Sequence, residues 1–266
     1  MVRDDFQLRQ RLTAILEAAG IENAALEAQW IAEDHPDAAE AEAIAHRRAQ
    51  HEPLQYLLNY WEFYGLPFKV GEGVLSPRQD TETLVDAVLS RISGKTGLHA
   101  VDLCTGSGCI ALALKSQRND LHVTGIELSD DALRYALENA KLLGLDADLR
   151  KGDVLDPQTA AQFHDLDLIV CNPPYLTAED MQHLQPEVAH EPAAALFGGE
   201  DGLDYYRNIT KLWKDALRIG GILCYEAGMG QAQDVAAIMR NQGFEEIGII
   251  PDAAGIERVI LGYKKF

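Results

Sequence analysis

From His99 to the C-terminus, short apolar runs alternate with amphipathic segments that have helical spacing. Strands are expected at 100–104, 123–128, 147–150, 166–171, 222–226, 246–250 and 258–263, and helices at 109–116, 130–143, 205–217 and 231–241. Strands that alternate with helices in this way form a mostly parallel sheet, because each connection must cross back over it. The chain is therefore expected to contain a doubly wound α/β domain with helices on both faces of its sheet.

The first 60 residues have a different pattern, in which apolar residues recur at helical spacing along three successive segments. Gly20 is placed to end the first helix, and Asn23 to cap the second. Pro36 is placed in the first turn of the third, which we expect to run to about Gln50, because Pro53 prevents it from continuing. The segment predicts a small helical bundle that serves for docking or packing.

Aromatic and β-branched residues follow this bundle and are interrupted by glycines and prolines, which is typical of two short strands joined by a turn. A helix is expected to begin shortly afterwards, near Thr81 or Glu82. The expected division is a helical N-terminal domain at 1–59, a β-hairpin linker at 60–80 and the α/β domain at 81–266.

Charge and composition exclude several classes of protein. The chain has 266 residues with 47% hydrophobic content and a formal net charge of −19, which argues against binding through many phosphate contacts but leaves room for a basic protein partner. No apolar run is long enough to span a membrane, and the N-terminus lacks the apolar core of a signal peptide. The four cysteines form no CxxC pair, so we expect reduced thiols, no metal site and a cytoplasmic location.

A glycine-rich turn follows the first strand of the α/β region. Its residues are Asp102, Cys104, Thr105, Gly106, Ser107 and Gly108. Such a turn lets the backbone approach a ligand closely, and Glu127 at the end of the next strand is placed to accept hydrogen bonds from ribose hydroxyls. This pattern fits NAD as well as S-adenosylmethionine. Asp102 favours the latter, because a carboxylate would repel a pyrophosphate and attract an α-amino group, although it can also simply brace the turn.

Asp153 and Val154 lie in the loop after the third strand of the sheet. A carboxylate there can accept a hydrogen bond from the exocyclic amine of adenine, while the neighbouring valine supplies an apolar wall. Loops that contain aspartate are common, so the pair becomes informative only beside the glycine-rich turn.

The sharpest motif is Asn172-Pro173-Pro174-Tyr175, which directly follows the apolar run at 166–171. Ligand sites of open α/β sheets lie at the carboxyl ends of strands. Two prolines keep the carbonyls of Asn172 and Pro173 out of a helix, and together with the Asn172 side-chain oxygen these acceptors suit a planar NH2 group on which Tyr175 can stack. We therefore expect Asn172, Pro173 and Tyr175 to be catalytic, with Pro174 completing the substrate site and Asn172 also contacting the cofactor.

The two motifs together resemble those of the N-methyltransferases that act on planar amines, and further segments resemble the HemK/PrmC glutamine methyltransferases of peptide chain release factors. The further segments are Glu52-Pro53-Leu54-Gln55-Tyr56, Phe63-Tyr64-Gly65-Leu66-Pro67-Phe68, Val74-Leu75-Ser76-Pro77-Arg78, Glu191-Pro192, Gly198-Gly199-Glu200-Asp201-Gly202-Leu203 and Arg258-Val259-Ile260-Leu261-Gly262. The resemblance covers nearly the whole chain.

This resemblance implies a class I S-adenosylmethionine-dependent methyltransferase, Rossmann-like with a seven-stranded, mostly parallel sheet, which carries a small helical bundle for docking its substrate. The implied reaction methylates the side-chain amide nitrogen of glutamine in the Gly-Gly-Gln motif of bacterial release factors. The residues 104–108 would line the methionine side of the cofactor, Glu127 the ribose, Asp153 and Val154 the adenine, and the residues 172–175 the glutamine amide. We expect a monomer that binds no nucleic acid directly.

The chain departs from the family pattern at two places and keeps it at a third. The family usually has glycine where Cys104 stands, and a small side chain there is expected to cost little. It more often has Pro-Glu-Thr-Glu where this chain has Gln79-Asp80-Thr81-Glu82, and its Asp-x-x-Gly-x-x-Arg motif corresponds to the stretch from Asp252 to Arg258.

Four alternative functions remain open. The form of the glycine-rich turn also resembles sister enzymes that methylate a glutamine of a large-subunit ribosomal protein. A DNA adenine-N6 methyltransferase is disfavoured by the charge. A nicotinamide-dependent enzyme is disfavoured by Asp102, and a non-catalytic binding protein by the intact Asn172 and Glu127.

Overall fold

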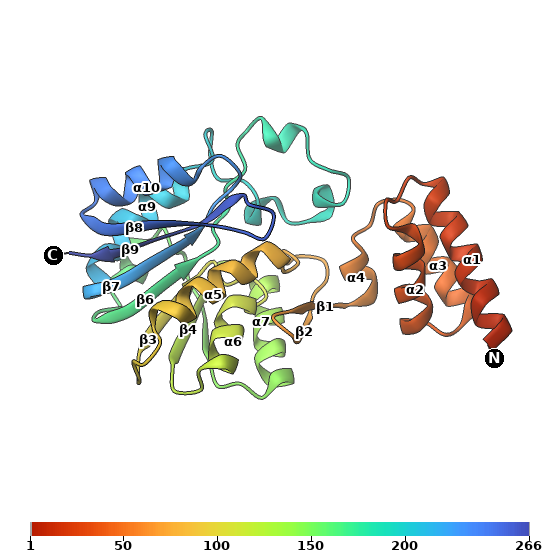
Figure 1. Ribbon diagram of the computed structural model, residues 1–266, viewed down its shortest axis with the longest axis horizontal. Coiled ribbons are helices and arrows are strands. Elements are labelled where there is room, and N and C mark those ends of the chain that lie inside the picture. Colours follow the sequence, from red (N-terminus) through yellow and green to blue (C-terminus); the bar gives the residue numbers. More distant parts are fainter. Residues whose placement is uncertain (1, 266) are drawn as a thin grey trace.

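The computed structural model describes residues 2–265, and Figure 1 shows a helical bundle at one end and an α/β unit at the other. The helices are α1 (Val2–Ala18), α2 (Ala24–Asp34), α3 (Ala38–Arg48), α4 (Leu54–Leu58), α5 (Glu82–Arg91), α6 (Cys109–Gln117), α7 (Asp130–Leu143), α8 (Pro157–Ala160), α9 (Asp204–Trp213) and α10 (Ala232–Asn241). The strands are β1 (Tyr60–Phe63), β2 (Leu66–Lys69), β3 (His99–Leu103), β4 (His122–Glu127), β5 (Asp148–Lys151), β6 (Leu166–Cys171), β7 (Leu217–Glu226), β8 (Phe244–Pro251) and β9 (Glu257–Lys264).

The seven-stranded sheet has the order β5-β4-β3-β6-β7-β9-β8. Its first five strands are parallel, and β9 pairs antiparallel with both β7 and β8. The chain first builds outward from β3 through β4 to β5, and then returns to place β6 on the other side of β3. Because Leu103 pairs with Cys171, the loops that follow β3 and β6 leave the sheet side by side, which is where open α/β sheets form their ligand crevice.

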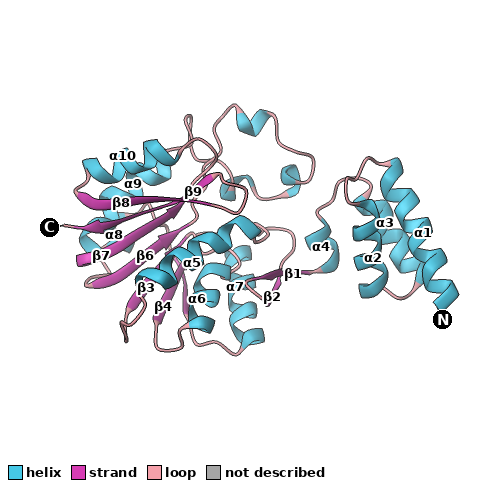
Figure 2. Ribbon diagram, in the orientation of Figure 1, coloured by secondary structure: helices cyan, strands magenta, loops and turns pink. Residues whose placement is uncertain are grey.

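Helices cover both faces of the sheet (Figure 2), as the alternation of strands and helices predicts. Successive residues of β3 and β6 point to opposite sides, so Val101 and Ile169 enter one core while Ala100 and Leu168 enter the other. The first core is completed by α9 and α10, and the second by α5, α6 and the β1–β2 hairpin.

The helical bundle has an apolar core of its own, formed by residues between Leu8 and Leu58. Gly20 ends the first helix with a φ of 76°, as expected. Asn23 stands at the N-cap of α2, but its side chain makes no capping hydrogen bond. The prediction that Pro36 lies in the first turn of the third helix is wrong. The helix begins at Ala38, after Asp37, whose carboxylate accepts the backbone N–H groups of Ala39 and Glu40.

The third helix ends at Arg48, within two residues of the expected end at about Gln50, and Pro53 precedes a short helix, α4, which leads into the hairpin. The aromatic rings of Trp30 and Trp61 meet edge to face at 5.8 Å, and the hydroxyl of Tyr56 donates to the carbonyl of Val74 at 2.6 Å. These contacts attach the bundle to the hairpin and to the segment that follows it. No helix among residues 2–265 is long and apolar enough to cross a membrane.

Candidate active site

The glycine-rich turn joins β3 to α6 and is braced from below by Asp102. This carboxylate is fully buried, and its Oδ2 accepts hydrogen bonds from Thr105 Oγ1 at 2.5 Å and from the backbone N–H of Ala111 at 3.2 Å. Burial raises its pKa to about 7. Asp102 does not line the adjoining cavity, so its contacts match the bracing role. A role in attracting an α-amino group stays a prediction.

Three residues of the turn have left-handed backbones, with φ of 58° at Cys104, 57° at Gly106 and 81° at Gly108. A Cβ on Gly108 would approach Leu112 and Ala136 to 3.2 and 3.3 Å, so this glycine serves the packing of α6 against α7. At Cys104 the cost of a side chain lies in its backbone conformation rather than in its size. The expectation that a small residue there costs little is therefore corrected.

Glu127, the last residue of β4, ties the turn to its neighbouring strand. Its two carboxylate oxygens accept the backbone N–H groups of Gly106 and Ser129, each at 2.8 Å. Each oxygen keeps a further lone pair on the side of the cavity, which Glu127 lines. The arrangement leaves Glu127 able to accept two more donors without losing its structural bonds.

Asp153 and Val154 line the same cavity from the loop after β5. Asp153 Oδ1 accepts the backbone N–H of Leu155 at 2.8 Å, so one oxygen holds the loop and the other is available. Val154 is buried, and its carbonyl accepts from the indole N–H of Trp213 at 2.8 Å. The loop is thereby held at the cavity wall by the core beneath it.

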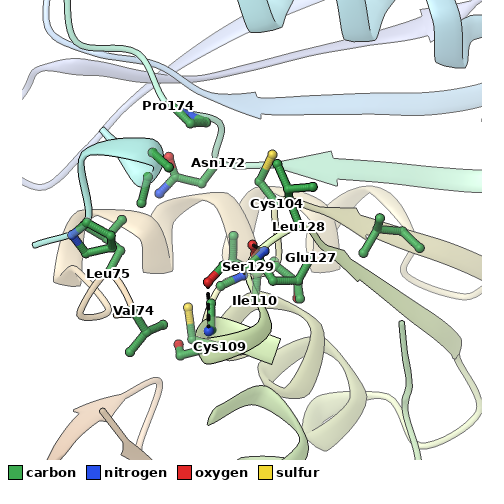
Figure 3. Close-up of a pocket in the computed structure, with 18 of the residues that line it drawn as sticks. Val74, Leu75, Cys104, Cys109, Ile110, Glu127, Leu128, Ser129, Asn172 and Pro174 are labelled. Carbon is green, nitrogen blue, oxygen red and sulfur yellow. Dashed lines mark hydrogen bonds between the residues drawn. The ribbon is translucent and has the colours of Figure 1, made fainter. Parts of the chain in front are cut away.

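Figure 3 shows this cavity, with Val74 and Leu75 of the linker lying across from Cys104, Glu127 and Leu128. Its volume is about 240 Å³. A second cavity of about 770 Å³ adjoins it, lined by the loop after β6. The two cavities share four lining residues, which are Leu75, Arg78, Asn172 and Ala195.

The Asn-Pro-Pro-Tyr motif is divided between the two cavities. Pro174 faces the first, Pro173 and Tyr175 face the second, and Asn172 lies on the boundary. Burial raises the pKa of Tyr175 to about 12, so its hydroxyl stays protonated at neutral pH. The structure thus brings the two sequence motifs together, with Asn172 as the motif residue that lines both cavities.

Several lining residues come from segments to which the sequence pattern assigned no role of their own. Leu75 and Arg78 enter from the linker, and Ala195 from the long loop between β6 and α9. Thr81 lies close enough to Asn172 to accept a hydrogen bond from its amide at 3.4 Å. Leu75 and Arg78 belong to the family-like segment 74–78, which was their only signal, and Ala195 had none.

The first cavity has the features that an adenosylmethionine-type cofactor requires. Glycine backbones open one wall, apolar side chains such as Val154 and Leu128 line it, and acceptors are present at Glu127 and Asp153. Ser107 Oγ and Asp102 Oδ1 are buried beside the turn, and neither has a hydrogen-bond partner in the described part of the chain. Among residues 2–265, no three His, Cys, Asp or Glu side chains gather closely enough to hold a metal ion.

Comparison with known proteins agrees with this architecture. A family model described as the methyltransferase small domain matches residues 67–199. A 16S rRNA methyltransferase of T. thermophilus, solved in complex with AdoMet and guanosine, has a TM-score of 0.56 and 17% identity, and the match covers 77% of this chain and 50% of that one. These matches confirm the expected class I methyltransferase fold.

Curated relatives extend over most of the chain. A release factor glutamine methyltransferase of Geobacter sulfurreducens is 40% identical over 266 residues, covering 93% of this chain and 92% of that protein. One from Thermodesulfovibrio yellowstonii is 41% identical over 223 residues, covering 82% of this chain and 79% of that protein. By its similarity to these proteins, the chain belongs to the family of release factor glutamine methyltransferases.

Proposed function

We propose that this chain transfers a methyl group from S-adenosylmethionine to the side-chain amide nitrogen, N5, of glutamine in the Gly-Gly-Gln motif of bacterial release factors. The names of its relatives support the substrate. The observation that carries the proposal is the position of Asn172, on the boundary between an adenosyl-sized cavity and a wider one. An amide held there by Asn172 would lie next to the methyl donor.

The residues that would hold the cofactor surround the first cavity. Glu127 would accept the ribose hydroxyls, Asp153 and Val154 would contact adenine, and the turn at 104–108 would face the methionine moiety, with Asp102 beneath it. When bound, S-adenosylmethionine supplies a methyl group that its positively charged sulfur already activates. The protein therefore has to align the accepting nitrogen with that group, rather than to create a reactive species.

Asn172 and Pro173 would prepare the accepting amide. Its nitrogen is a poor nucleophile, since its lone pair is delocalised into the carbonyl group. If Asn172 Oδ1 and the carbonyl of Pro173 each accept one N–H, the lone pair is directed toward the first cavity, and both oxygens stabilise the positive charge that develops on nitrogen. Tyr175 would stack on the amide plane, and the proton would leave to water after transfer.

The release factor would reach this site through the second cavity, with the bundle at 1–59 as a docking domain. All residues invoked belong to one chain, so we propose that a single copy is active. We place the reaction in the cytoplasm, where release factors work.

The substrate is tested by incubating the protein with labelled S-adenosylmethionine and either purified release factor, large-subunit ribosomal proteins or DNA. Label is expected on the release factor, at its Gly-Gly-Gln glutamine, as mapped by mass spectrometry. Label on a ribosomal protein or on DNA, with none on the release factor, would refute the proposed substrate.

Asn172→Ala tests the role of the amide acceptor. This variant is expected to lose at least about 100-fold in kcat, because it removes one of the two oxygens that orient the substrate. Its dissociation constant for S-adenosylmethionine, measured by calorimetry, is expected to stay within a few-fold of that of the unmodified protein. Unchanged turnover would remove Asn172 from the reaction.

A further inference from the structure

Glu226 is a buried carboxylate beside the proposed site that the reaction described above does not use. It is the last residue of β7, and because Tyr225 pairs with Cys171, Glu226 lies beside Asn172, which directly follows the adjacent strand β6. Its residue is 2% exposed, and its Oε2 has no hydrogen-bond partner among the described residues. A carboxylate in such surroundings needs a reason to be there, because its burial is costly.

The groups around Glu226 come from three parts of the chain. Thr81 and Asp80 reach it from the turn before α5, Asn172 from the end of β6, and Arg258 from β9. Arg258 is already engaged, since its guanidinium donates to Asp252 at 3.2 Å and lies 3.6 Å from Asp80. The polar groups that remain available as hydrogen-bond donors to Glu226 are therefore the hydroxyl of Thr81 and the amide of Asn172.

One hydrogen bond among these groups sets a direction. Asn172 Nδ2 donates to Thr81 Oγ1 at 3.4 Å, which leaves the hydroxyl proton of Thr81 available for Glu226, whose charge is stabilised by both Thr81 and Asn172. An ionised carboxylate can only accept, so it attracts the single proton of the Thr81 hydroxyl, and Thr81 Oγ1 can then only accept from Asn172. This direction turns the NH2 group of Asn172 toward Glu226 and leaves its Oδ1 for the cavity.

We propose that Glu226 is a positioning residue: as a carboxylate it fixes the direction of the hydrogen bond from Asn172 to Thr81 and keeps Asn172 Oδ1 available to the substrate amide. The catalytic consequence rests on the proposed function. The orientation of Asn172 does not, since it involves only residues of this chain.

The proposal has a consequence for pH. Burial raises the pKa of Glu226 to about 7, against the opposing effects of Thr81, Arg258 and Asn172. A protonated Glu226 can itself donate to Thr81 Oγ1, so the proton of the Thr81 hydroxyl is no longer held by Glu226. Thr81 can then either accept from the Asn172 amide or donate to it, and the orientation of that amide is no longer fixed. The Asn172 side chain should then adopt both orientations at acid pH and one orientation at alkaline pH.

The orientation is tested by NMR of the full-length protein without substrate, following the side-chain NH2 signals of Asn172 from pH 5.5 to 8.5. The signals, assigned by their loss in Asn172→Ala, are expected to shift with a midpoint near 7. Glu226→Gln and Thr81→Val should each abolish this shift, and Thr81→Ser should restore it. The matched control is Asp102→Asn, which alters the other buried carboxylate whose pKa is about 7 and should leave the shift in place.

A kinetic experiment tests the catalytic consequence. At saturating S-adenosylmethionine, kcat of the unmodified protein should fall below pH 7, whereas Glu226→Gln should show no acid limb and about tenfold lower kcat at pH 8, the loss expected for one oriented hydrogen bond. The affinity for S-adenosylmethionine should not change.

The outcomes separate the two proposals. An Asn172 shift that persists in Glu226→Gln, or that is absent from the unmodified protein, overturns the role of Glu226 whatever the substrate is. Failure of the unmodified protein to methylate any release factor overturns the proposed function, while the NMR result still decides whether Glu226 orients Asn172.

Discussion

Cys104 has a left-handed backbone, with φ of 58°, at the point where β3 turns toward the cofactor cavity. A Cβ atom in this conformation clashes with the following carbonyl group, at a cost of about 1–2 kcal/mol. Glycine avoids the clash, which explains physically why glycine suits this position in proteins that resemble this one. The cysteine therefore carries backbone strain in the loop that the proposed function depends on.

Replacing Cys104 is expected to separate the effect of the backbone from that of the thiol. Cys104→Gly should be more stable to urea than Cys104→Ala by about 1 kcal/mol, because only glycine removes the Cβ atom. Comparing the two variants cancels the loss of the sulfur that they share. Equal midpoints and slopes in both unfolding curves would contradict the strain.

The buried carboxylate of Asp102 makes stability depend on pH. Burial raises its pKa from 3.8 to about 7, so between these values the folded protein binds a proton that the unfolded chain has lost. Its contribution is therefore complete at pH below 3.8 and disappears as the pH rises through 7. Asp102→Asn removes this dependence while keeping an acceptor for Thr105.

Urea unfolding of both proteins at pH 5 and pH 8 measures the effect. The unfolding free energy of Asp102→Asn minus that of the unmodified protein should be larger at pH 8 than at pH 5 by about 2–3 kcal/mol, so the variant becomes relatively more stable as the pH rises. A difference that stays constant with pH would show that Asp102 titrates normally in the folded state.

At the scale of elements, the long loop between β6 and α9 is fastened to the linker by Glu191. This side chain is 1% exposed, accepts the backbone N–H of Ser76 at 3.1 Å and pairs with Arg78. Because Arg78 and Leu75 line both cavities, the same contact that holds the loop also fixes part of the proposed site.

Glu191→Ala is expected to loosen this loop. The variant leaves the N–H of Ser76 without its partner, at a cost of about 1–3 kcal/mol, and releases Arg78. Limited proteolysis should cut between residues 176 and 203 faster than in the unmodified protein. Glu200→Ala, at an exposed position of the same loop, is the matched control and should be cut at the original rate.

Most elements of the α/β region could be predicted because their periodicity is strong. The helix at 130–143 and the strand at 166–171 have the expected bounds, and the other predicted strands are displaced by a few residues at most, apart from β7, which begins five residues early. The short helices α4 and α8 were missed, since four or five residues show no helical period. The sequence does not distinguish Asp37 as the cap of α3 from Pro36 as a residue of its first turn, because both are local signals of a helix start.

At the scale of the whole molecule, Arg48 connects the helical bundle to the catalytic region. Its guanidinium donates to Glu27 of α2 at 2.7 Å and to Glu187 of the long loop at 3.0 Å, and its side chain is 8% exposed. Glu187 also contacts His51 at 2.9 Å. The bundle is therefore held against the loop that lines the second cavity, rather than through the linker alone.

Arg48→Ala is expected to destabilise the protein by about 3 kcal/mol, because the buried carboxylate of Glu27 then has no positively charged partner. The neighbouring Arg47 is the matched control, since it pairs with Glu52 at the surface and its loss should cost about 1 kcal/mol or less. Urea unfolding followed by tryptophan fluorescence measures both. Equal losses would mean that the Arg48 contacts contribute no more than a surface pair.

The sequence by itself determined the class of fold and the two loops that carry the proposed chemistry. Apolar periodicity is a local property, and so is the glycine-rich turn after β3 or the Asn-Pro-Pro-Tyr segment after β6. Their neighbourhood then follows from the rule that parallel strands present their carboxyl ends at one edge.

Only the tertiary structure decided which residues complete the site. Thr81 lies 91 positions before the Asn172 that it contacts, and Glu226 comes from a third element. The tertiary structure also decided that Asp102 lies beneath the turn rather than in the cavity. Such contacts depend on the order of strands in the sheet and on side-chain packing, and no local pattern of residues specifies either.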